Sequence, residues 1–424
     1  MRFLVLNRTP LGGRRFPDWL GDDHEAVLVT DPAAVSQDPD VRRAQLAGYL
    51  HSELFEGFHF NPLVEARALD LHRTFGFDRI IALSEFDILR AARLRGLLGA
   101  PGQDVTSATA FRDKLTMKRI LERAGVPLAP YAPAAHLDDL LTFIRVHDYP
   151  VVVKPRRGGG SMDVHVLRGE DDLVALLGAD GSLGSDDGAQ LLVEKYVEHE
   201  LFHVDGIVVD GQVRLMWPSS QGETTCLDIR EGRVLRSCLL DPDDVLLDPL
   251  RSLTRQALDA LPSPGTFMFH AEIFRDRDGD LLFNEVASRM GGGMIEQVLE
   301  SGFGVTLPEV YVRSLAGNKP PSLPDTPLRI AGLSLFPPRE GELVSLPGTC
   351  PVPGITSYQT HAVPGTRLAP ARSSVEKIAS VLAAGDTRAE TENALTAAAT
   401  WFESGSVIRD VRPEHREEGR KEEG

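Results

Sequence analysis

A β-hairpin predicted between residues 266 and 288 constrains the fold of this chain most. Two apolar runs, FMFHAEIF and LLFNEVA, flank the dipeptide Asp278-Gly279. An Asp-Gly pair in this setting is typical of a type I′ turn, which needs positive φ at both central residues. Counting outward from that turn places Glu272 directly opposite Glu285, and cross-strand partners point to the same side of a sheet. The sequence therefore predicts two neighbouring carboxylates on one face.

The paired carboxylates predict a magnesium site. Two such groups repel each other unless a cation lies between them, and Mg²⁺ is typically held by one or two carboxylates and substrate phosphates. Arg289 follows Glu285 by four residues, and Gly291–Gly293 then lead into a predicted helix whose free N–H groups suit an anion. The alternative is a solvated hairpin with incidental acids, but apolar residues such as Phe283 interrupt any solvent face.

Composition excludes several classes of partner. The 424 residues allow several domains, and the net charge of -17 argues against nucleic acid or an anionic membrane as the main partner. Three cysteines without a CxxC spacing predict neither a disulfide framework nor a zinc site. The initial FLVL run is too short for a signal peptide, and no stretch reaches transmembrane length. We expect a soluble, cytoplasmic protein in which anionic substrates meet a local cluster of positive groups.

Alternating strands and helices are expected at the N-terminus. The apolar runs RFLVLN, EAVLVTD and DRIIALSE are separated by helix-like stretches, which predicts an α/β domain with a parallel sheet. Parallel sheets bind ligands at the carboxyl ends of their strands. Asn7–Gly13, Thr30-Asp31 and Ser84-Glu85 follow the three strands and are expected at that edge.

A glycine loop follows the first strand after residue 150. Lys154 ends the apolar run PVVVK, and Gly159, Gly160 and Ser161 come shortly after it. Glycines let backbone N–H groups approach phosphates, and the lysine supplies a positive charge. The lysine precedes the glycines, so this is not a P-loop. A mobile turn remains the alternative.

The strand AQLLVEKYV turns polar where it ends. From Glu194 to Val197, the backbone of such a strand end can pair with a flat heterocycle, with Glu200 and Asp205 near for a sugar hydroxyl. Exposed glutamates at strand ends are common, so this segment alone is weak support for a nucleotide site.

Taken in order, these motifs resemble the ATP-grasp superfamily. Arg-Asp-Lys within the predicted helix FRDKLTMKRILERAG is followed by KP with the glycine loop, EKYV, HAEIF and FNEVASRMGGG at suitable spacings. The resemblance covers residues 80–400, and the turns GELVSLPG and VPGT look like the lid of carboxylate–amine ligases. It implies an α/β and α+β ATP-grasp fold with an N-terminal parallel-sheet domain and a C-terminal lid.

The resemblance also implies five segments. They are an N-terminal domain (1–105), a first ATP-grasp half with the glycine loop (106–190), a second half with the metal-binding hairpin (191–325), a lid region (326–412) and a disordered, charge-dense tail (413–424). The stretch GADGSLGSDDG is expected to be a flexible connection.

Residue roles follow from the same resemblance. Lys114 and Lys154 would contact the adenine side and the α/β-phosphates of ATP, and Arg289 would hold the acyl phosphate and the transferred phosphoryl group. Glu272 and Glu285 would bind Mg²⁺, with Mn²⁺ as an alternative. The contacts to adenine and ribose would come from Glu194, Lys195, Tyr196, Val197, Glu200 and Asp205.

One position departs from the family pattern. Ala287 stands where the family often has a metal-binding asparagine. Asn284 is expected to point to the opposite face of the hairpin, because it is one residue away from Glu285. The second metal site would then depend on Glu285 alone, as a bidentate ligand, or on phosphate and water.

The implied reaction is the ATP-dependent formation of an amide or peptide bond through an acyl phosphate, with release of ADP and phosphate. Small carboxylates and amines are the expected substrates, and amino acids are the leading class. The alternatives are a biotin-carboxylase-like subunit and a non-catalytic ATP-binding module, the latter suggested by Ala287. Against the carboxylase, Met117-Lys118 lies on a predicted helix and not in a carrier hairpin. The oligomeric state is left open, with a homodimer as one option.

Overall fold

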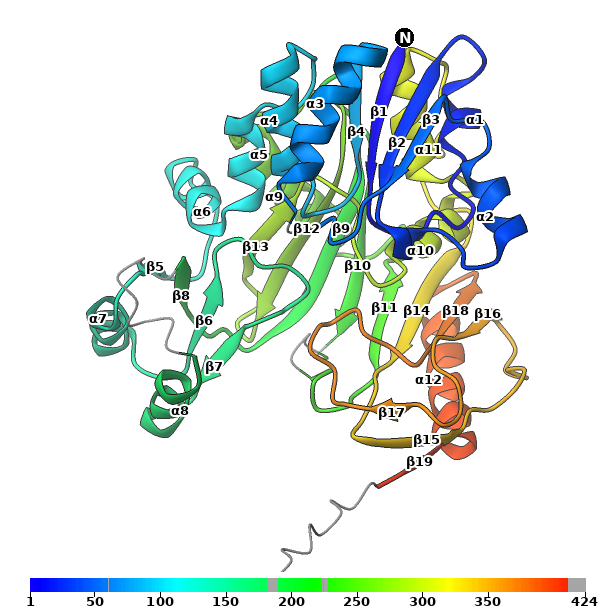
Figure 1. Ribbon diagram of the computed structural model, residues 1–424. Helices are drawn as coiled ribbons and strands as arrows, with labels where there is room; N and C mark the ends of the chain where they lie inside the picture. Colours follow the sequence, from blue (N-terminus) through cyan, green and yellow to red (C-terminus); the bar gives the residue numbers. More distant parts are fainter. Residues whose placement is uncertain (60, 181–189, 223, 225–227, 411–424) are drawn as a thin grey trace, which may run out of the picture.

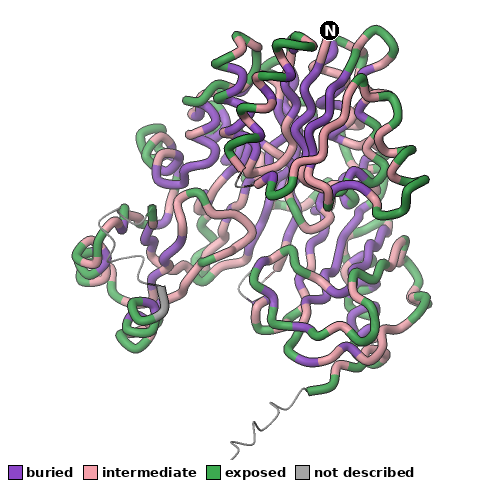
Figure 2. Tube along the Cα trace, in the orientation of Figure 1, coloured by how far each residue is buried: buried purple, intermediate pink, exposed green. Residues whose placement is uncertain are grey.

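Four β-sheets make up the described part of the chain (Figure 1). The computed structural model describes all residues except 60, 181–189, 223, 225–227 and 411–424. Most of the predicted flexible connection and the whole predicted tail lie outside the described residues. Figure 2 shows mainly buried residues along the strands and many exposed residues on the outer helices.

The N-terminal sheet is parallel, with the strand order β3-β2-β1-β4. The three predicted strands are confirmed, and the near-continuous apolar run of β1 is buried because helices cover both faces of the sheet. The fourth strand, β3, was not predicted, because its sequence HSEL is short and polar. The elements are β1 (Arg2–Asn7), α1 (Phe16–Leu20), β2 (Glu25–Thr30), the 3₁₀ helix η1 (Pro32–Ala34), α2 (Pro39–Leu46), β3 (His51–Leu54), α3 (Leu63–Phe75), β4 (Arg79–Ala82) and α4 (Ile88–Leu98).

The helix predicted for FRDKLTMKRILERAG is confirmed from Lys114 to Arg123, but its predicted start is wrong, because Phe111 and Arg112 end a separate helix. The two helices are α5 (Val105–Arg112) and α6 (Lys114–Arg123). Asp113 between them has extended backbone angles, and its Oδ1 accepts a hydrogen bond from the N–H of Thr116 at 3.0 Å. This side chain caps α6 and so ends the first helix one residue earlier.

A small antiparallel sheet carries the glycine loop and has the order β5-β8-β6-β7. The predicted strand–loop–strand unit is confirmed as β6 and β7. With its two helices this sheet forms a separate lobe in Figure 1. The elements are β5 (Tyr131–Ala134), α7 (Leu137–His147), β6 (Val151–Pro155), β7 (His165–Leu167), α8 (Glu170–Asp180) and β8 (Leu191–Lys195).

The second half of the chain forms a large sheet of eight strands, in the order β13-β12-β9-β10-β11-β14-β18-β16. Strands from the predicted lid region extend this sheet, and a three-stranded sheet, β17-β15-β19, lies beside it. The strands of the two sheets are β9 (His199–Val209), β10 (Gln212–Gly222), β11 (Leu235–Leu239), β12 (Phe267–Asp276), β13 (Leu281–Ala287), β14 (Ile330–Phe336), β15 (Gly341–Ser345), β16 (Ile355–Thr360), β17 (Arg367–Leu368), β18 (Ala379–Gly385) and β19 (Val407–Arg409). The helices of this part are α9 (Leu247–Ala260), α10 (Ile295–Phe303), α11 (Leu307–Ala316) and α12 (Arg388–Gly405).

The β12–β13 hairpin has the predicted pair but not the predicted turn. The N–H of Asp276 donates to the carbonyl of Asp280 at 3.0 Å, so three residues form the loop, and Gly279 has φ 89°. The side chain of Asp276 accepts from the N–H groups of Asp278 and Asp280, which favours the longer loop over a type I′ turn. A bulge then shifts the register by one residue, so Glu272 still pairs with Glu285.

Candidate active site

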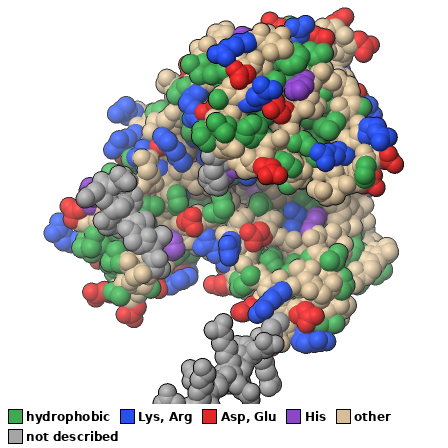
Figure 3. All heavy atoms as spheres, viewed as in Figure 1, with side chains coloured by type: hydrophobic (Ala, Val, Ile, Leu, Met, Phe, Trp, Pro, Cys, Tyr) green, Lys and Arg blue, Asp and Glu red, His purple; other side chains and the backbone are tan. Residues whose placement is uncertain are grey.

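Two cavities meet at the hairpin. A cavity of about 150 Å³ lies between the small sheet and the hairpin, and another of about 510 Å³ extends toward the N-terminal sheet and the C-terminal strands. Glu272, Glu285, Gly159 and Gly160 line both of them. Figure 3 shows a hollow across this face of the molecule, with acidic, basic and histidine side chains along it. We call the two spaces the smaller and the larger cavity.

Most of the predicted site residues line the smaller cavity. This agreement concerns position, because their roles toward a nucleotide stay predictions. The predicted residues among those that line it are Lys114, Lys154, Gly159, Gly160, Ser161, Glu194, Lys195, Tyr196, Val197, Glu272 and Glu285.

Glu194 joins two lysines at the base of the smaller cavity. Its Oε1 lies 2.8 Å from Nζ of Lys118 and its Oε2 lies 2.7 Å from Nζ of Lys154. All three side chains are buried. Burial alone would raise the pKa of Glu194, but the two ammonium groups outweigh it and lower the pKa to about 2. Glu194 is therefore an ionised carboxylate that holds two lysines in place.

Lys118 is a site residue that the sequence analysis missed. It lies four residues after Lys114 on α6, and this spacing places two side chains on one helix face. That spacing was the available signal. Lys118 also donates to the backbone carbonyl of Asn284 at 3.2 Å, which ties α6 to the hairpin.

The segment after β8 forms an edge of the smaller cavity. The N–H of Lys195 donates to the carbonyl of Pro130, and its Nζ donates to the carbonyl of His147 at the end of α7. No acceptor is found among the described residues for the N–H of Val197. The predicted pairing of this N–H with a heterocycle stays a prediction.

The structure does not bring Glu200 and Asp205 to the smaller cavity, which corrects the predicted ribose contacts. Glu200 lies on β9, where its carboxylate is 3.3 Å from Nη1 of Arg275 on the neighbouring strand. Asp205 is buried, with Oδ2 2.6 Å from Nδ1 of His203 and Oδ1 2.9 Å from Nδ1 of His270. Asp205 lies in the interior of β9, which is eleven residues long, and this strand leads it away from Val197.

Asn284 points into the site, which corrects the prediction that it faces away. The bulge places it beside Glu285, where its Nδ2 donates to Oε2 of Glu272 at 3.0 Å. Nζ of Lys154 donates to its Oδ1 at 3.3 Å. A bulge cannot be read from alternation of side chains, because one extra residue turns the strand. The amide therefore connects the acidic pair to Lys154.

The acidic pair has the character of a hard-metal site. Burial alone would raise the pKa of Glu272, but His270, Lys154 and Lys114 outweigh it and lower the pKa to about 2. Nζ of Lys114 lies 3.0 Å from Oε2 of Glu285. The hairpin thus presents carboxylate oxygens toward both cavities, and such oxygens suit Mg²⁺ or Mn²⁺.

Arg289 lies at the end of β13 on the wall of the larger cavity. Its Nε forms an ion pair with Glu85, and its Nη1 donates to the carbonyl of Met290 at 2.7 Å. Arg112 also pairs with Glu85. Burial would raise the pKa of this glutamate, but Arg289 and Arg112 lower it to about 2. Glu85 follows β4 at the sheet edge where the sequence analysis expected ligand-binding residues.

Two family models match this chain. The model described as "Carbamoyl-phosphate synthase L chain, ATP binding domain" matches residues 113–213, which include the glycine loop and β8. The model described as "L-amino acid ligase C-terminal domain 2" matches residues 334–401.

Similar curated proteins include ligases, a formyltransferase and carboxylase subunits. The chain is 26% identical over 287 residues to the L-arginine-specific L-amino acid ligase of Bacillus subtilis, covering 66% of this chain and 68% of that protein. It is 28% identical over 231 residues to the formate-dependent phosphoribosylglycinamide formyltransferase of Bifidobacterium adolescentis, covering 49% of this chain and 53% of that protein.

Solved structures with the same fold cover nearly the whole chain. The L-amino acid ligase from Bacillus licheniformis has a TM-score of 0.74 at 16% identity and covers 97% of this chain and 99% of its own. The biotin carboxylase domain of Hydrogenobacter thermophilus 2-oxoglutarate carboxylase, in complex with MgADP, has a TM-score of 0.66 at 19% identity, covering 96% and 91%. These likenesses confirm the predicted fold class. A search of the described helices finds none long and apolar enough to cross a membrane.

Proposed function

We propose that this chain, which belongs to the ATP-grasp superfamily, is a ligase that joins the carboxylate of one amino acid to the amine of another. ATP is consumed and ADP and phosphate are released. The observation that carries the proposal is the meeting of two cavities at Glu272 and Glu285. Amino acids are the proposed substrates because the similar curated ligase and the C-terminal family model both concern L-amino acid ligases.

The smaller cavity suits the nucleotide. The free N–H of Val197 would face the adenine edge, and Lys154 would face the phosphates from the end of β6. Glu194 holds Lys154 and so fixes the position of its charge. Gly159 and Gly160 bring backbone close to both cavities, where the terminal phosphate would lie.

The shared acids suit Mg²⁺ or Mn²⁺. Glu272 and Glu285 would hold the ion, which would neutralise phosphate charge when it is bound. Asn284 keeps Glu272 oriented through its hydrogen bond. Lys114 and Lys154 supply further positive charge around the phosphates, as phosphoryl transfer requires.

The larger cavity suits the amino-acid substrates. A substrate carboxylate beside the hairpin would attack the γ-phosphate, and the acyl phosphate formed would then react with an amine to give the amide. Arg289, on the wall of this cavity, has a planar set of donors that matches the oxygens of an acyl phosphate. Its ion pair with Glu85 holds the guanidinium at the cavity wall.

The proposal is tested by incubating the protein with Mg-ATP and pairs of amino acids. We expect phosphate release that needs both amino acids and a product whose mass equals their sum less one water. Glu272→Gln and Glu285→Gln should abolish release, whereas Glu198→Gln, a surface glutamate, should not. Release that needs bicarbonate and biotin would instead identify a carboxylase, and ATP binding without release under any condition would identify a binding module.

A further inference from the structure

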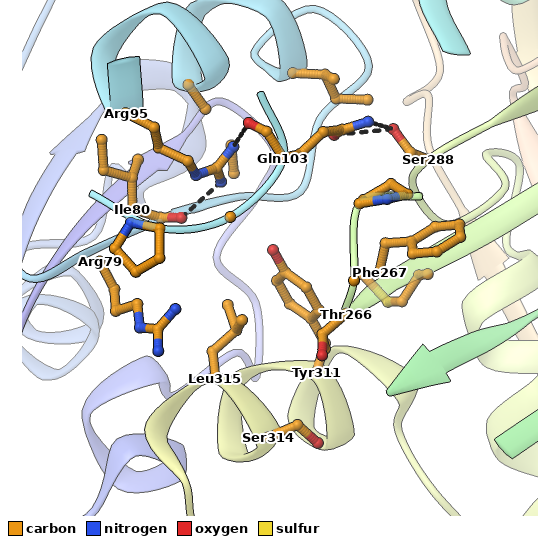
Figure 4. A pocket seen from close by; sticks show the side chains of 18 of the residues that line it. Arg79, Ile80, Arg95, Gln103, Thr266, Phe267, Ser288, Tyr311, Ser314 and Leu315 are labelled. Atoms are coloured by element: carbon orange, nitrogen blue, oxygen red, sulfur yellow. Dashed lines mark hydrogen bonds between the residues drawn. The ribbon is translucent and has the colours of Figure 1, made fainter. Parts of the chain in front are cut away.

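A third cavity lies behind the active site, between the N-terminal sheet and the large sheet. Figure 4 shows this cavity from close by. Its volume is about 240 Å³, and among the described residues it shares only Met268 and Arg289 with the larger cavity. Its walls come from β4, α4, the segment at Gln103, the start of β12 and helix α11. We call it the rear cavity.

The rear cavity contains positive charge without a carboxylate partner. Arg95 is 7% exposed, and it donates to the backbone carbonyls of Ile80 at 2.8 Å and Gln103 at 3.2 Å. Its Nε is buried and has no hydrogen-bond partner. Arg79 also lines the cavity, and among the described residues neither arginine forms an ion pair. Burial lowers the pKa of Arg95; Tyr311 acts against this lowering, and Arg79 acts in the same direction as burial.

This arrangement is costly without a ligand. A buried charge is normally paired, because its desolvation is compensated only by an opposite charge or by several hydrogen bonds. Arg289, the third arginine on the wall, already pairs with Glu85. The acid on the wall, Asp210, is exposed, and its Oδ1 accepts a hydrogen bond from Thr266. Among the described residues, neither Arg95, which is buried, nor Arg79, which is half-buried, therefore has an acidic side chain within ion-pair distance.

A third polar group points into the same space. The hydroxyl of Tyr311 points into the cavity in Figure 4, and no hydrogen-bond partner is found for it among the described residues. Burial raises the pKa of Tyr311, and the nearby positive charges of Arg95 and Arg79 act to lower it. Hydroxyl and guanidinium groups that line one space can together bind a carboxylate.

The rest of the wall is apolar. Side chains from four elements bring aliphatic and aromatic surface to the cavity, and these are Ile80, Ile88, Ala91, Phe267, Met268 and Leu315. An inorganic anion would leave this surface without contacts. A carboxylate with a short aliphatic chain would satisfy both the arginines and the apolar wall.

We propose that the rear cavity binds a small aliphatic carboxylate, with the carboxylate at Arg79, Arg95 and Tyr311. The ligand lies outside the reaction site but touches its framework, since Ser288 and Arg289 both line the cavity. Binding of this ligand requires no ATP and no turnover, so it can be tested apart from the proposed ligase activity. A bound carboxylate at this place would also hold the strand end that carries Arg289.

Calorimetric titration at constant ionic strength tests the proposal, with isovalerate as the probe. We expect one site in the wild type, no binding of the neutral isovaleramide, and at least tenfold weaker isovalerate binding in Arg79→Met. Tyr311→Phe should weaken binding less, because it removes one neutral donor. Arg73→Met, an exposed arginine of the same domain that pairs with Asp70, is the matched control and should bind as the wild type does.

Two further titrations distinguish binding in the rear cavity from binding in the active site. Isovalerate binding should persist in Glu285→Gln and with ATP present, and its loss there would place the probe in the active site and overturn the proposal. Equal binding in the wild type and Arg79→Met, or no binding at all, would also overturn it. Inorganic phosphate that binds more tightly than isovalerate would refute the assignment to an aliphatic carboxylate.

Discussion

Replacing Glu194 by glutamine should destabilise the protein strongly, because this carboxylate compensates two buried ammonium groups. The pKa of Glu194 is lowered from 4.5 to about 2. Since a tenfold change in proton affinity is worth about 1.4 kcal/mol, the lowering corresponds to about 3 kcal/mol of stability at neutral pH. The loss of one partner from a buried ion pair costs about 3–5 kcal/mol in other proteins, which agrees with this value.

Thermal unfolding followed by circular dichroism measures the effect in the absence of nucleotide. A loss of about 3 kcal/mol should lower Tm by roughly 6–12 °C if the part of the protein that unfolds cooperatively has about 150–250 residues. Glu198→Gln is the control, because Glu198 and its partner Arg277 are both more than half exposed, at 53% and 79%. A surface pair of this kind contributes little, so its loss should leave Tm almost unchanged.

The pH dependence gives a second measure of the same interaction. A carboxylate with a lowered pKa stabilises the fold above its unfolded pKa of 4.5, and this stabilisation is lost as the pH falls toward 2. The difference in Tm between the wild type and Glu194→Gln should therefore be constant above pH 5 and shrink below pH 4.5. An unchanged Tm in Glu194→Gln at neutral pH would refute the reasoning.

Two other substitutions test the hairpin. Arg289→Lys should keep ATP affinity within a few-fold but lower kcat strongly, because a point charge cannot replace the planar donors at an acyl phosphate; an unchanged kcat with a lower Tm would assign Arg289 to the ion pair with Glu85 alone. Asn284→Ala should raise KM for Mg-ATP, since it frees both Glu272 and Lys154 from the amide, whereas Asn284→Asp should lower Tm by adding a third carboxylate beside Glu272. Steady-state kinetics and thermal unfolding on the same preparations check both.

The parts of the fold that follow from local pattern could be predicted from the sequence. The apolar runs of β1, β2 and β4 identify a buried parallel sheet, because each run is apolar on both faces. The strand β3 could not be recognised, since three of its four residues are polar and it becomes a strand by pairing with β2. Asp113 divides one amphipathic pattern into two helices, and its capping role depends on local geometry that periodicity does not carry.

The site could be predicted where side chains are fixed by cross-strand pairing, and less well where they depend on distant contacts. The pairing of Glu272 with Glu285 was predicted correctly from the hairpin. The structure reaches this pairing through a three-residue loop and a bulge, and not through the predicted type I′ turn. Glu85 was expected at the sheet edge and Lys118 could have been found from its spacing to Lys114, but their ion pairs with Arg289 and Glu194 could not be predicted, because these partners are far away in the sequence. Asp205 was expected at the nucleotide site because it is close to Val197 in the sequence, but it does not line the smaller cavity.

The bulge at Asn284 explains why a hairpin with Ala287 in the usual asparagine position can still have an ordered acidic pair. In a regular ladder Asn284 would lie on the far face, and Glu272 would face Glu285 without an amide between them and Lys154. The extra residue turns the amide toward Glu272, and Lys154 then completes a chain of hydrogen bonds that continues to Glu194. One backbone irregularity thus connects the acids shared by the two cavities to the lysines of the smaller cavity. We infer that the bulge, more than the identity of residue 287, determines whether this hairpin can hold a metal ion beside the phosphates.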